Sequence, residues 1–95
     1  MPLPGRTRST SAAGLVLLTR RDCHLCREAR EVVERVLPDY DARLEVIDVD
    51  SREDLARQYG HEVPVLLVEG VRVFKFRVEE RRLRRRLRPW RRSEP

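Results

Sequence analysis

The chain has 95 residues, which is enough for one small domain, with 39% charged and 40% hydrophobic residues. This composition allows a modest core of one sheet and a few helices. No apolar run approaches the roughly 18 residues that a membrane span needs. The net charge of +5 is concentrated near the C-terminus, because residues 77–95 hold 9 Arg and 3 Glu. These properties predict a single domain without a membrane-spanning segment.

The two ends of the chain differ from its middle. Residues 1–13 are rich in Pro, Gly, Ser and Thr, and we expect them to form a disordered leader. A domain should then cover 14–88, followed by a basic tail over 89–95. No secretory signal pattern is present, so we expect a cytoplasmic protein. In that compartment a close Cys pair is more often catalytic or metal-binding than structural.

The first two elements follow from the spacing of apolar residues. Residues 14–19 form a short, nearly continuous apolar run, which predicts a strand buried on both faces. Apolar residues at helical spacing then predict a helix over 25–37. Asp22 is its predicted N-cap, and Pro38 is its stop signal.

A second strand and a short helix come next. Residues 43–49 alternate between apolar and charged side chains, which predicts the strand. Ser51-Arg52-Glu53-Asp54 resembles a capping box in which Asp replaces Glu, and it predicts a helix that ends at Gly60.

The last third of the chain predicts a hairpin and a helix. Residues 63–68 and 71–76 have strand patterns, and Glu69-Gly70 between them indicates a tight turn. Residues 79–88 predict a helix in which acids come first and arginines follow. The order β-α-β-α-β-β-α requires a right-handed parallel crossover and then an antiparallel pair. We therefore expect an α/β fold, a four-stranded mixed sheet with helices on both faces.

Both cysteines lie in Cys23-His24-Leu25-Cys26, where a buried strand leads into a helix. Free backbone N–H groups and the helix dipole stabilise an anion there, so we predict a lowered pKa for the Cys23 thiol. Cys26 lies one turn later on the same face, close enough for a disulfide, and should be more buried. The predicted chemistry is thiol–disulfide exchange, in which Cys23 attacks and Cys26 resolves the mixed disulfide.

Charged neighbours should adjust the acidity of the attacking thiol. Arg20, Arg21, Arg27 and a protonated His24 would stabilise the thiolate. Asp22 would oppose them unless its carboxylate caps the helix. His24 could equally be an exposed helix residue without such a role.

Two other interpretations of the cysteine pair stay open. The pair could be half of a zinc site, which would need two more ligands, or it could be two inert core cysteines. The available histidines are His24, which is poorly placed inside the motif, and His61, which we expect in a loop. We therefore predict no metal.

Val63-Pro64 stands at the start of the third predicted strand. A proline can simply begin a strand. In this element order, a loop that brings a cis Pro64 opposite the cysteines is the preferred interpretation.

Five segments together resemble the glutaredoxin-like branch of the thioredoxin superfamily, over about residues 14–87. They are Leu17-Leu18-Thr19, Cys23-His24-Leu25-Cys26, Ile47-Asp48-Val49-Asp50, Tyr59-Gly60 and Val63-Pro64-Val65-Leu66. The resemblance implies a thioredoxin-like fold and a dithiol active site. It also implies that Pro64 is cis and that the backbone of Val63 pairs with bound substrate.

Two segments differ from glutaredoxins, which usually carry Pro-Tyr between the cysteines and a Gly-Gly turn that helps to hold glutathione. This chain has His24-Leu25 and Phe76-Arg77 there, so no glutathione-binding residues are carried over. We expect a thiol–disulfide oxidoreductase without a cofactor. Its substrate would be a disulfide-containing protein or a low-molecular-weight thiol, and its electron donor a thiol or a reductase. We expect a monomer with no membrane partner.

The arginine-rich stretch 81–92 supports an alternative function. In the plainest interpretation it is a solvated basic helix end, with Trp90 anchoring the tail. In the alternative, the protein is a non-catalytic thioredoxin-fold binding module whose C-terminal helix docks an acidic partner or nucleic acid. With one aromatic residue and no known motif there, nucleic acid is the less favoured partner. We expect Asp48 and Asp50 to be solvated turn acids.

Overall fold

The computed structural model describes residues 12–92, and residues 1–11 and 93–95 lie outside the described part. The strands are β1 (Ala13–Thr19), β2 (Ala42–Asp48), β3 (Val65–Val68) and β4 (Val71–Lys75), the helices are α1 (His24–Val36), α2 (Glu53–Tyr59) and α3 (Glu80–Arg86), and the 3₁₀ turns are η2 (Leu37–Asp39), η3 (Val49–Ser51) and η4 (Arg88–Trp90). Among residues 12–92, no helix is long and apolar enough to cross a membrane.

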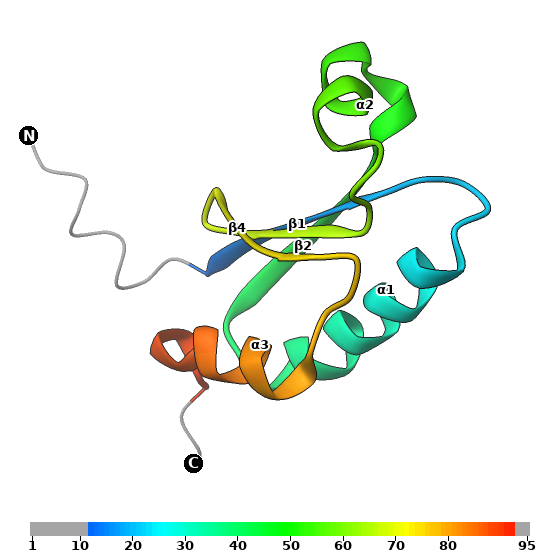
Figure 1. Cartoon of the computed structure of the whole chain (residues 1–95). Helices are drawn as coiled ribbons and strands as arrows, with labels where there is room; N and C mark the ends of the chain where they lie inside the picture. Colours follow the sequence, from blue (N-terminus) through cyan, green and yellow to red (C-terminus); the bar gives the residue numbers. More distant parts are fainter. Residues whose placement is uncertain (1–11, 93–95) are drawn as a thin grey trace, which may run out of the picture.

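The strands form one sheet in the order β2-β1-β3-β4. β1 pairs parallel with β2 and antiparallel with β3, and β3 pairs antiparallel with β4. Parallel neighbours need a long crossover, and α1 supplies it between β1 and β2 (Figure 1). The predicted α/β fold with a four-stranded mixed sheet is confirmed.

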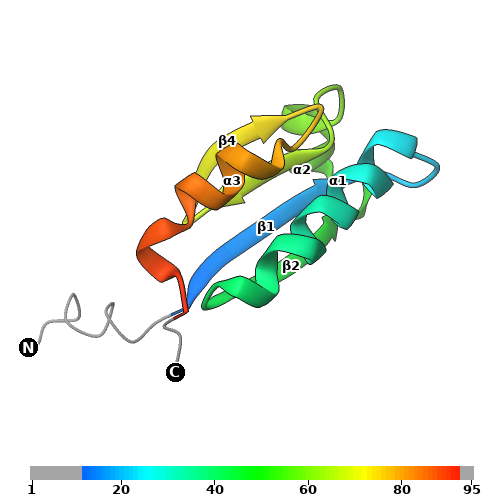
Figure 2. The same ribbon diagram turned by 90° about the horizontal axis from the view of Figure 1, so that it is seen from below.

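Helices cover both faces of the sheet (Figures 1 and 2). α1 and α3 lie on one face and enclose the larger core, to which β1 contributes Leu15 and Leu17. α2 covers the other face, where Leu18 from β1 belongs to a smaller buried cluster and Val16 packs against it. Because successive strand residues point to opposite faces, a strand covered on both sides is apolar throughout.

The first and third strands begin at different residues from those predicted. Ala13, which we expected in the leader, is the fully buried first residue of β1 and donates its N–H to the Asp41 carbonyl at 2.9 Å. β3 begins at Val65 rather than residue 63, so Val63-Pro64 precedes the strand. The proline is therefore part of the approach to β3.

The predicted capping box at Ser51 is wrong. The Ser51 hydroxyl donates to the Asp48 carbonyl at 2.6 Å, within η3. Asp48 also accepts the Asp50 N–H on its carboxylate at 2.8 Å. These local bonds form the 3₁₀ turn η3, so α2 starts later, with Arg52 as an N-cap that has no side-chain cap bond.

After α3 the chain folds back against the beginning of β2. Trp90 packs, partly buried, against the larger core, and its carbonyl accepts the Asp41 N–H at 2.7 Å. Arg91 forms an isolated β-bridge with Tyr40. Residues 89–92, assigned to a tail from the sequence, are thus attached to the domain.

Candidate active site

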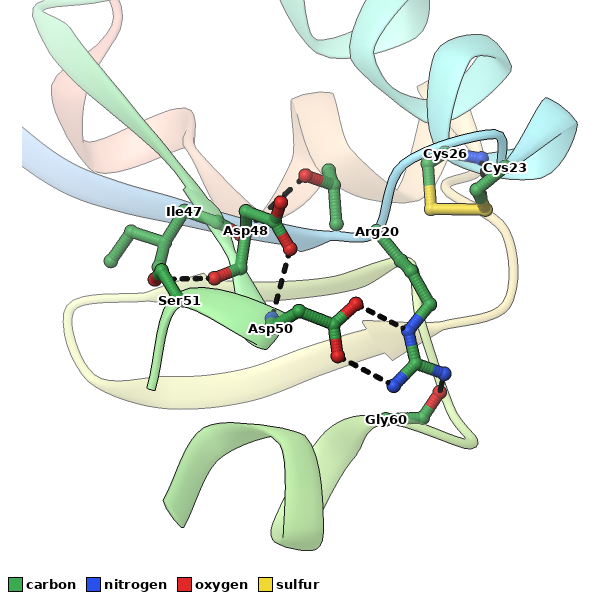
Figure 3. A network of polar contacts seen from close by, with 9 residues as sticks. Arg20, Cys23, Cys26, Ile47, Asp48, Asp50, Ser51 and Gly60 are labelled. Carbon is green, nitrogen blue, oxygen red and sulfur yellow. Dashed lines mark hydrogen bonds and ion pairs between the residues drawn. A yellow bond between two sulfur atoms is a disulfide. The ribbon is translucent and has the colours of Figure 1, made fainter. Parts of the chain in front are cut away.

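Cys23 and Cys26 form a disulfide at the start of α1 (Figure 3). Their Cα atoms lie 5.1 Å apart, within the range that a disulfide requires. Cys23 is partly exposed, whereas Cys26, on the first turn of the helix, is only 3% exposed. The fold thus joins the two cysteines and leaves the first of them more accessible.

Cys23 is itself the N-cap residue of α1. Its Sγ accepts a hydrogen bond from the Cys26 N–H at 3.1 Å. The prediction that Asp22 caps this helix is therefore wrong: Asp22 is exposed in a left-handed turn (φ 53°), a conformation that Asp tolerates. A sulfur that faces the free N–H groups of a first turn lies where the helix dipole stabilises a thiolate.

The disulfide borders a hollow of about 260 Å³. Its lining comes from the loop after β1, from α1 and from β2: Thr19, Arg20, Arg21, Asp22, Cys23, Cys26, Arg27, Arg30 and Val46. Two of these arginines are matched by acids elsewhere, Arg20 by Asp50 and Arg30 by Glu34. The remaining arginines, Arg21 and Arg27, carry more charge than the single acid of the lining, Asp22. The hollow is therefore positively charged and favours a thiolate over a thiol.

Arg20 ties the loop before the cysteines to the opposite face of the sheet (Figure 3). Its Nε and Nη2 donate to the two carboxylate oxygens of Asp50, each at 2.9 Å, and its Nη1 donates to the Gly60 carbonyl at 2.9 Å. A Cβ at residue 60 would collide with the Ala56 carbonyl oxygen and lie 3.0 Å from Arg20, so glycine fits there.

This network changes two expectations. Asp50 is not simply a solvated turn acid, because its hydrogen bond with Arg20 holds the pKa of the Asp50 carboxyl below its ordinary value. The charge of Arg20 is matched by Asp50, so Arg20 contributes less to the thiolate than we expected. Asp48, the other acid of the pair, accepts the backbone N–H of η3.

The two histidines lie in different parts of the fold. His24 Nε2 lies 2.7 Å from a Glu28 carboxylate oxygen, and its Nδ1 lies 3.5 Å from an Arg27 nitrogen. These partners hold the largely exposed imidazole on its own helix. His61 is exposed in the loop after α2. Within the described residues, no three His, Cys, Asp or Glu side chains are grouped so that they could hold a metal ion.

Val63 and Pro64 lie at the same end of the sheet as the cysteine loop. Leu18, near the end of β1, pairs with Val65, at the start of β3. The segment that leaves β1 toward the cysteines therefore lies beside the segment that leads into β3. The Val63–Pro64 peptide bond is cis, Pro64 is buried, and its carbonyl accepts the Phe76 N–H at 2.7 Å.

Two exposed apolar side chains, Leu25 and Phe76, were not among the predicted site residues. They are 42% and 46% exposed, and both line two hollows of about 300 and 450 Å³ that also share Arg77 and Glu79. Leu25 is part of the cysteine motif, and the Phe76 N–H is hydrogen-bonded to the Pro64 carbonyl. This surface therefore connects the cysteine motif with the Val63-Pro64 segment. Both positions depart from the glutaredoxin pattern, and this departure is the feature of the sequence that could have identified them as site residues.

The sheet order, the cysteine pair at the start of the first helix and the proline before β3 define a protein of the thioredoxin fold. The model of the family described as Glutaredoxin-like domain (DUF836) matches residues 14–88. The chain therefore belongs to the glutaredoxin-like domain family. The resemblance inferred from the sequence is confirmed.

Solved structures share this fold. The X-ray structure of target protein XcR50 from X. campestris is 31% identical with a TM-score of 0.66, over 78% of this chain and 95% of that one. The solution structure of protein Ne2328 from Nitrosomonas europaea is 29% identical with a TM-score of 0.70, over 81% and 93%. A mutant thioredoxin from Halobacterium salinarum is 26% identical with a TM-score of 0.64, over 95% and 84%. No curated protein matches the chain.

Proposed function

We propose that the protein is a dithiol–disulfide oxidoreductase that works through Cys23 and Cys26. The observation that carries this proposal is the placement of the pair: the two sulfurs are bonded at a helix N-terminus beside a positively charged hollow. Two inert core cysteines would both be buried, whereas Cys23 is partly exposed. An attacking thiol has to be both accessible and stabilised as an anion.

The proposed reaction transfers two electrons to the substrate. The Cys23 thiolate attacks one sulfur of a substrate disulfide, and the other substrate sulfur leaves as a thiolate that takes up a proton. Cys26 then loses its proton and attacks the Cys23 sulfur, which releases the second substrate thiol. The substrate disulfide is reduced to two thiols, and the protein is oxidised to the Cys23–Cys26 disulfide.

The oxidised protein needs two electrons to return to the dithiol. A low-molecular-weight thiol or a thiol-containing reductase would supply them by the same exchange in reverse, so the cycle requires no metal or other cofactor. We propose that the protein acts as a cytoplasmic monomer on disulfide-containing proteins or on low-molecular-weight substrates. The backbone of Val63, next to Pro64, would then contact an extended substrate segment.

A trapping experiment tests the proposal. In a Cys26→Ser variant, a mixed disulfide at Cys23 has no resolving thiol and should accumulate as a covalent complex with disulfide-containing proteins on non-reducing gels. The matched Cys23→Ser variant also keeps one cysteine, but the remaining thiol is buried, so we expect no complex. Equal trapping by the two variants, or trapping by neither, would contradict the assignment of Cys23 as the nucleophile.

The pH dependence of alkylation tests the predicted acidity. In the Cys26→Ser variant, the rate of modification of Cys23 by iodoacetamide should have its midpoint at least about one pH unit below the ordinary thiol pKa of about 8.5. In the Cys23→Ser variant, Cys26 should have its midpoint near or above that value, because burial disfavours a thiolate. A Cys23 that titrates like a free thiol would remove the basis for the mechanism.

A further inference from the structure

Five arginines surround Tyr40 at the end of α1 that is far from the cysteines. This hollow has a volume of about 340 Å³, and we name it the arginine hollow; its lining is Tyr40, Arg81, Arg84, Arg85, Arg88 and Arg91. α3 supplies three of these arginines, η4 supplies Arg88, and Arg91 directly follows η4; α3 lies beside the C-terminal end of α1 (Figure 1). α1 has 13 residues and therefore extends about 20 Å, so the hollow is separate from the disulfide.

We propose that the arginine hollow binds the oligophosphate group of a small molecule. This site would be independent of the proposed thiol chemistry. The argument rests on the repulsion within the cluster, on its unmatched charge and on the shape of its lining.

Folding alone does not account for the cluster. One face of α3 and η4 carries arginines at the helical spacing i, i+3, i+4 and i+7: Arg81, Arg84, Arg85 and Arg88. The opposite face buries Leu83 and Leu87 completely, which is what attaches the helix to the core. Like charges at these spacings repel one another. The helix dipole favours Arg84 and Arg85 in the last turn of α3 but not Arg81 in the first turn. A bound anion would relieve the repulsion within the cluster.

The charge of the hollow is only partly matched by acids. Arg84 lies 2.7 Å from an Asp39 oxygen and 3.0 Å from a Glu80 oxygen, and the Tyr40 hydroxyl donates to the Arg84 carbonyl at 3.3 Å. These contacts hold Arg84 as a rigid part of the wall. Within residues 12–92, the other four lining arginines form no ion pair with an acid. Both acids are paired with Arg84 alone among the lining residues, and Glu80 is also shared with Arg35, which lies outside the lining. The four other arginines therefore leave the hollow with a net positive charge.

The lining also specifies the chemistry of the ligand. Each guanidinium can donate two parallel N–H groups to one phosphate, so several around one hollow suit several linked phosphates. The volume of 340 Å³ is at the small end of the range for small-molecule sites, about 300 to 1,000 Å³. Tyr40, the aromatic residue of the lining, is 2% exposed and gives a nucleic-acid base no surface for stacking. The lining thus offers several guanidinium groups for phosphates and no exposed aromatic ring for a base.

Inorganic triphosphate is a direct probe, and the protein carries its own reporter. Trp90 is the single tryptophan of the chain, and it lies between Arg88 and Arg91 in the sequence. We expect its fluorescence to change saturably as triphosphate is added to the full chain, with one site and with weaker binding at higher salt. Thermal unfolding should shift to higher temperature with triphosphate, because the ligand binds the folded state.

Two adjacent substitutions separate a built site from diffuse charge. Arg85→Gln removes a lining arginine, whereas Arg86→Gln removes the same charge from the next residue, which is exposed and does not line the hollow. We expect Arg85→Gln to weaken triphosphate binding about tenfold or more, and Arg86→Gln by about twofold or less. Circular dichroism checks that both variants fold. Equal weakening, or no saturable binding at about 0.15 M salt, would overturn the proposal.

Further ligands distinguish the source of the phosphates. Equal affinities for inorganic triphosphate and ATP would mean that the phosphate chain alone is recognised. Tighter binding of ATP would identify a nucleotide as the natural source, and both results support the proposal. A single-stranded RNA that binds much more tightly than triphosphate, with a steep salt dependence spread over many contacts, would replace the proposal with a nucleic-acid surface.

Discussion

Replacing Phe76 with glycine should leave the protein more stable than replacing it with alanine. Phe76 has a φ of 72°, in the left-handed region that glycine adopts freely. Both substitutions remove the same half-exposed ring and its contact with the Lys75 ammonium group, 5.5 Å from the ring centre. These losses are the same in both variants, so the difference in stability between the variants comes from the backbone. Because a left-handed residue with a Cβ is disfavoured by about 1 to 2 kcal/mol, we expect the glycine variant to be more stable by about 1 kcal/mol.

This order is the reverse of the usual one, and unfolding experiments can measure it. For a domain of this size, about 1 kcal/mol corresponds to a shift in Tm of about 4–8 °C, which circular dichroism resolves. Lys75 is the matched control, because it lies in β4 without a positive φ, and there alanine should be the more stable by about 0.5–1 kcal/mol. If the Phe76→Ala variant is at least as stable as the Phe76→Gly variant, the reasoning is refuted. The expected result would identify Phe76 as a residue that keeps backbone strain in order to hold a ring beside Leu25.

The Arg20–Asp50 ion pair and the packing of Trp90 against the core each give a further prediction. Because Arg20 lowers the pKa of the Asp50 carboxyl, wild type should be more stable than Asp50→Asn above the ordinary Asp pKa of 3.8, and this advantage should disappear as the pH falls through the lowered pKa. Urea denaturation at several pH values measures it, and an undiminished advantage at about pH 2 would contradict the ion pair. Trp90→Ala should lower the free energy of unfolding by about 1–2 kcal/mol, because Trp90 is only partly buried against the core; an unchanged Tm would show that residues 89–92 do not stabilise the domain.

Local patterns in the sequence determined the order of the elements and the position of the cysteines. Short stretches of sequence were enough to indicate these elements: the continuous apolar run of β1, the helical spacing of apolar residues in α1 and the turn residues Glu69-Gly70. Once the elements are in this order, chain connectivity allows few sheets. The place of the cysteine motif at the beginning of a helix is local information as well, so the candidate nucleophile could be named from the sequence.

Only the tertiary structure decided which partner each polar group takes. Asp22 and Cys23 both stood where a cap could form, and the geometry of the turn after β1 selected Cys23. Arg20 and Asp50 lie 30 residues apart in the sequence and meet because β1 and β2 are adjacent in the sheet.

The arginine hollow arises in the same way. Its arginines are visible in the sequence as a basic run, but Asp39 and Tyr40 join them only because α3 packs beside the C-terminal end of α1, and Arg91 joins them because the chain after α3 folds back along the beginning of β2. Local patterns report the periodicity of a segment. They cannot rank distant partners that compete for the same charge or hydrogen bond, because that competition is decided by which segments the folded chain brings together.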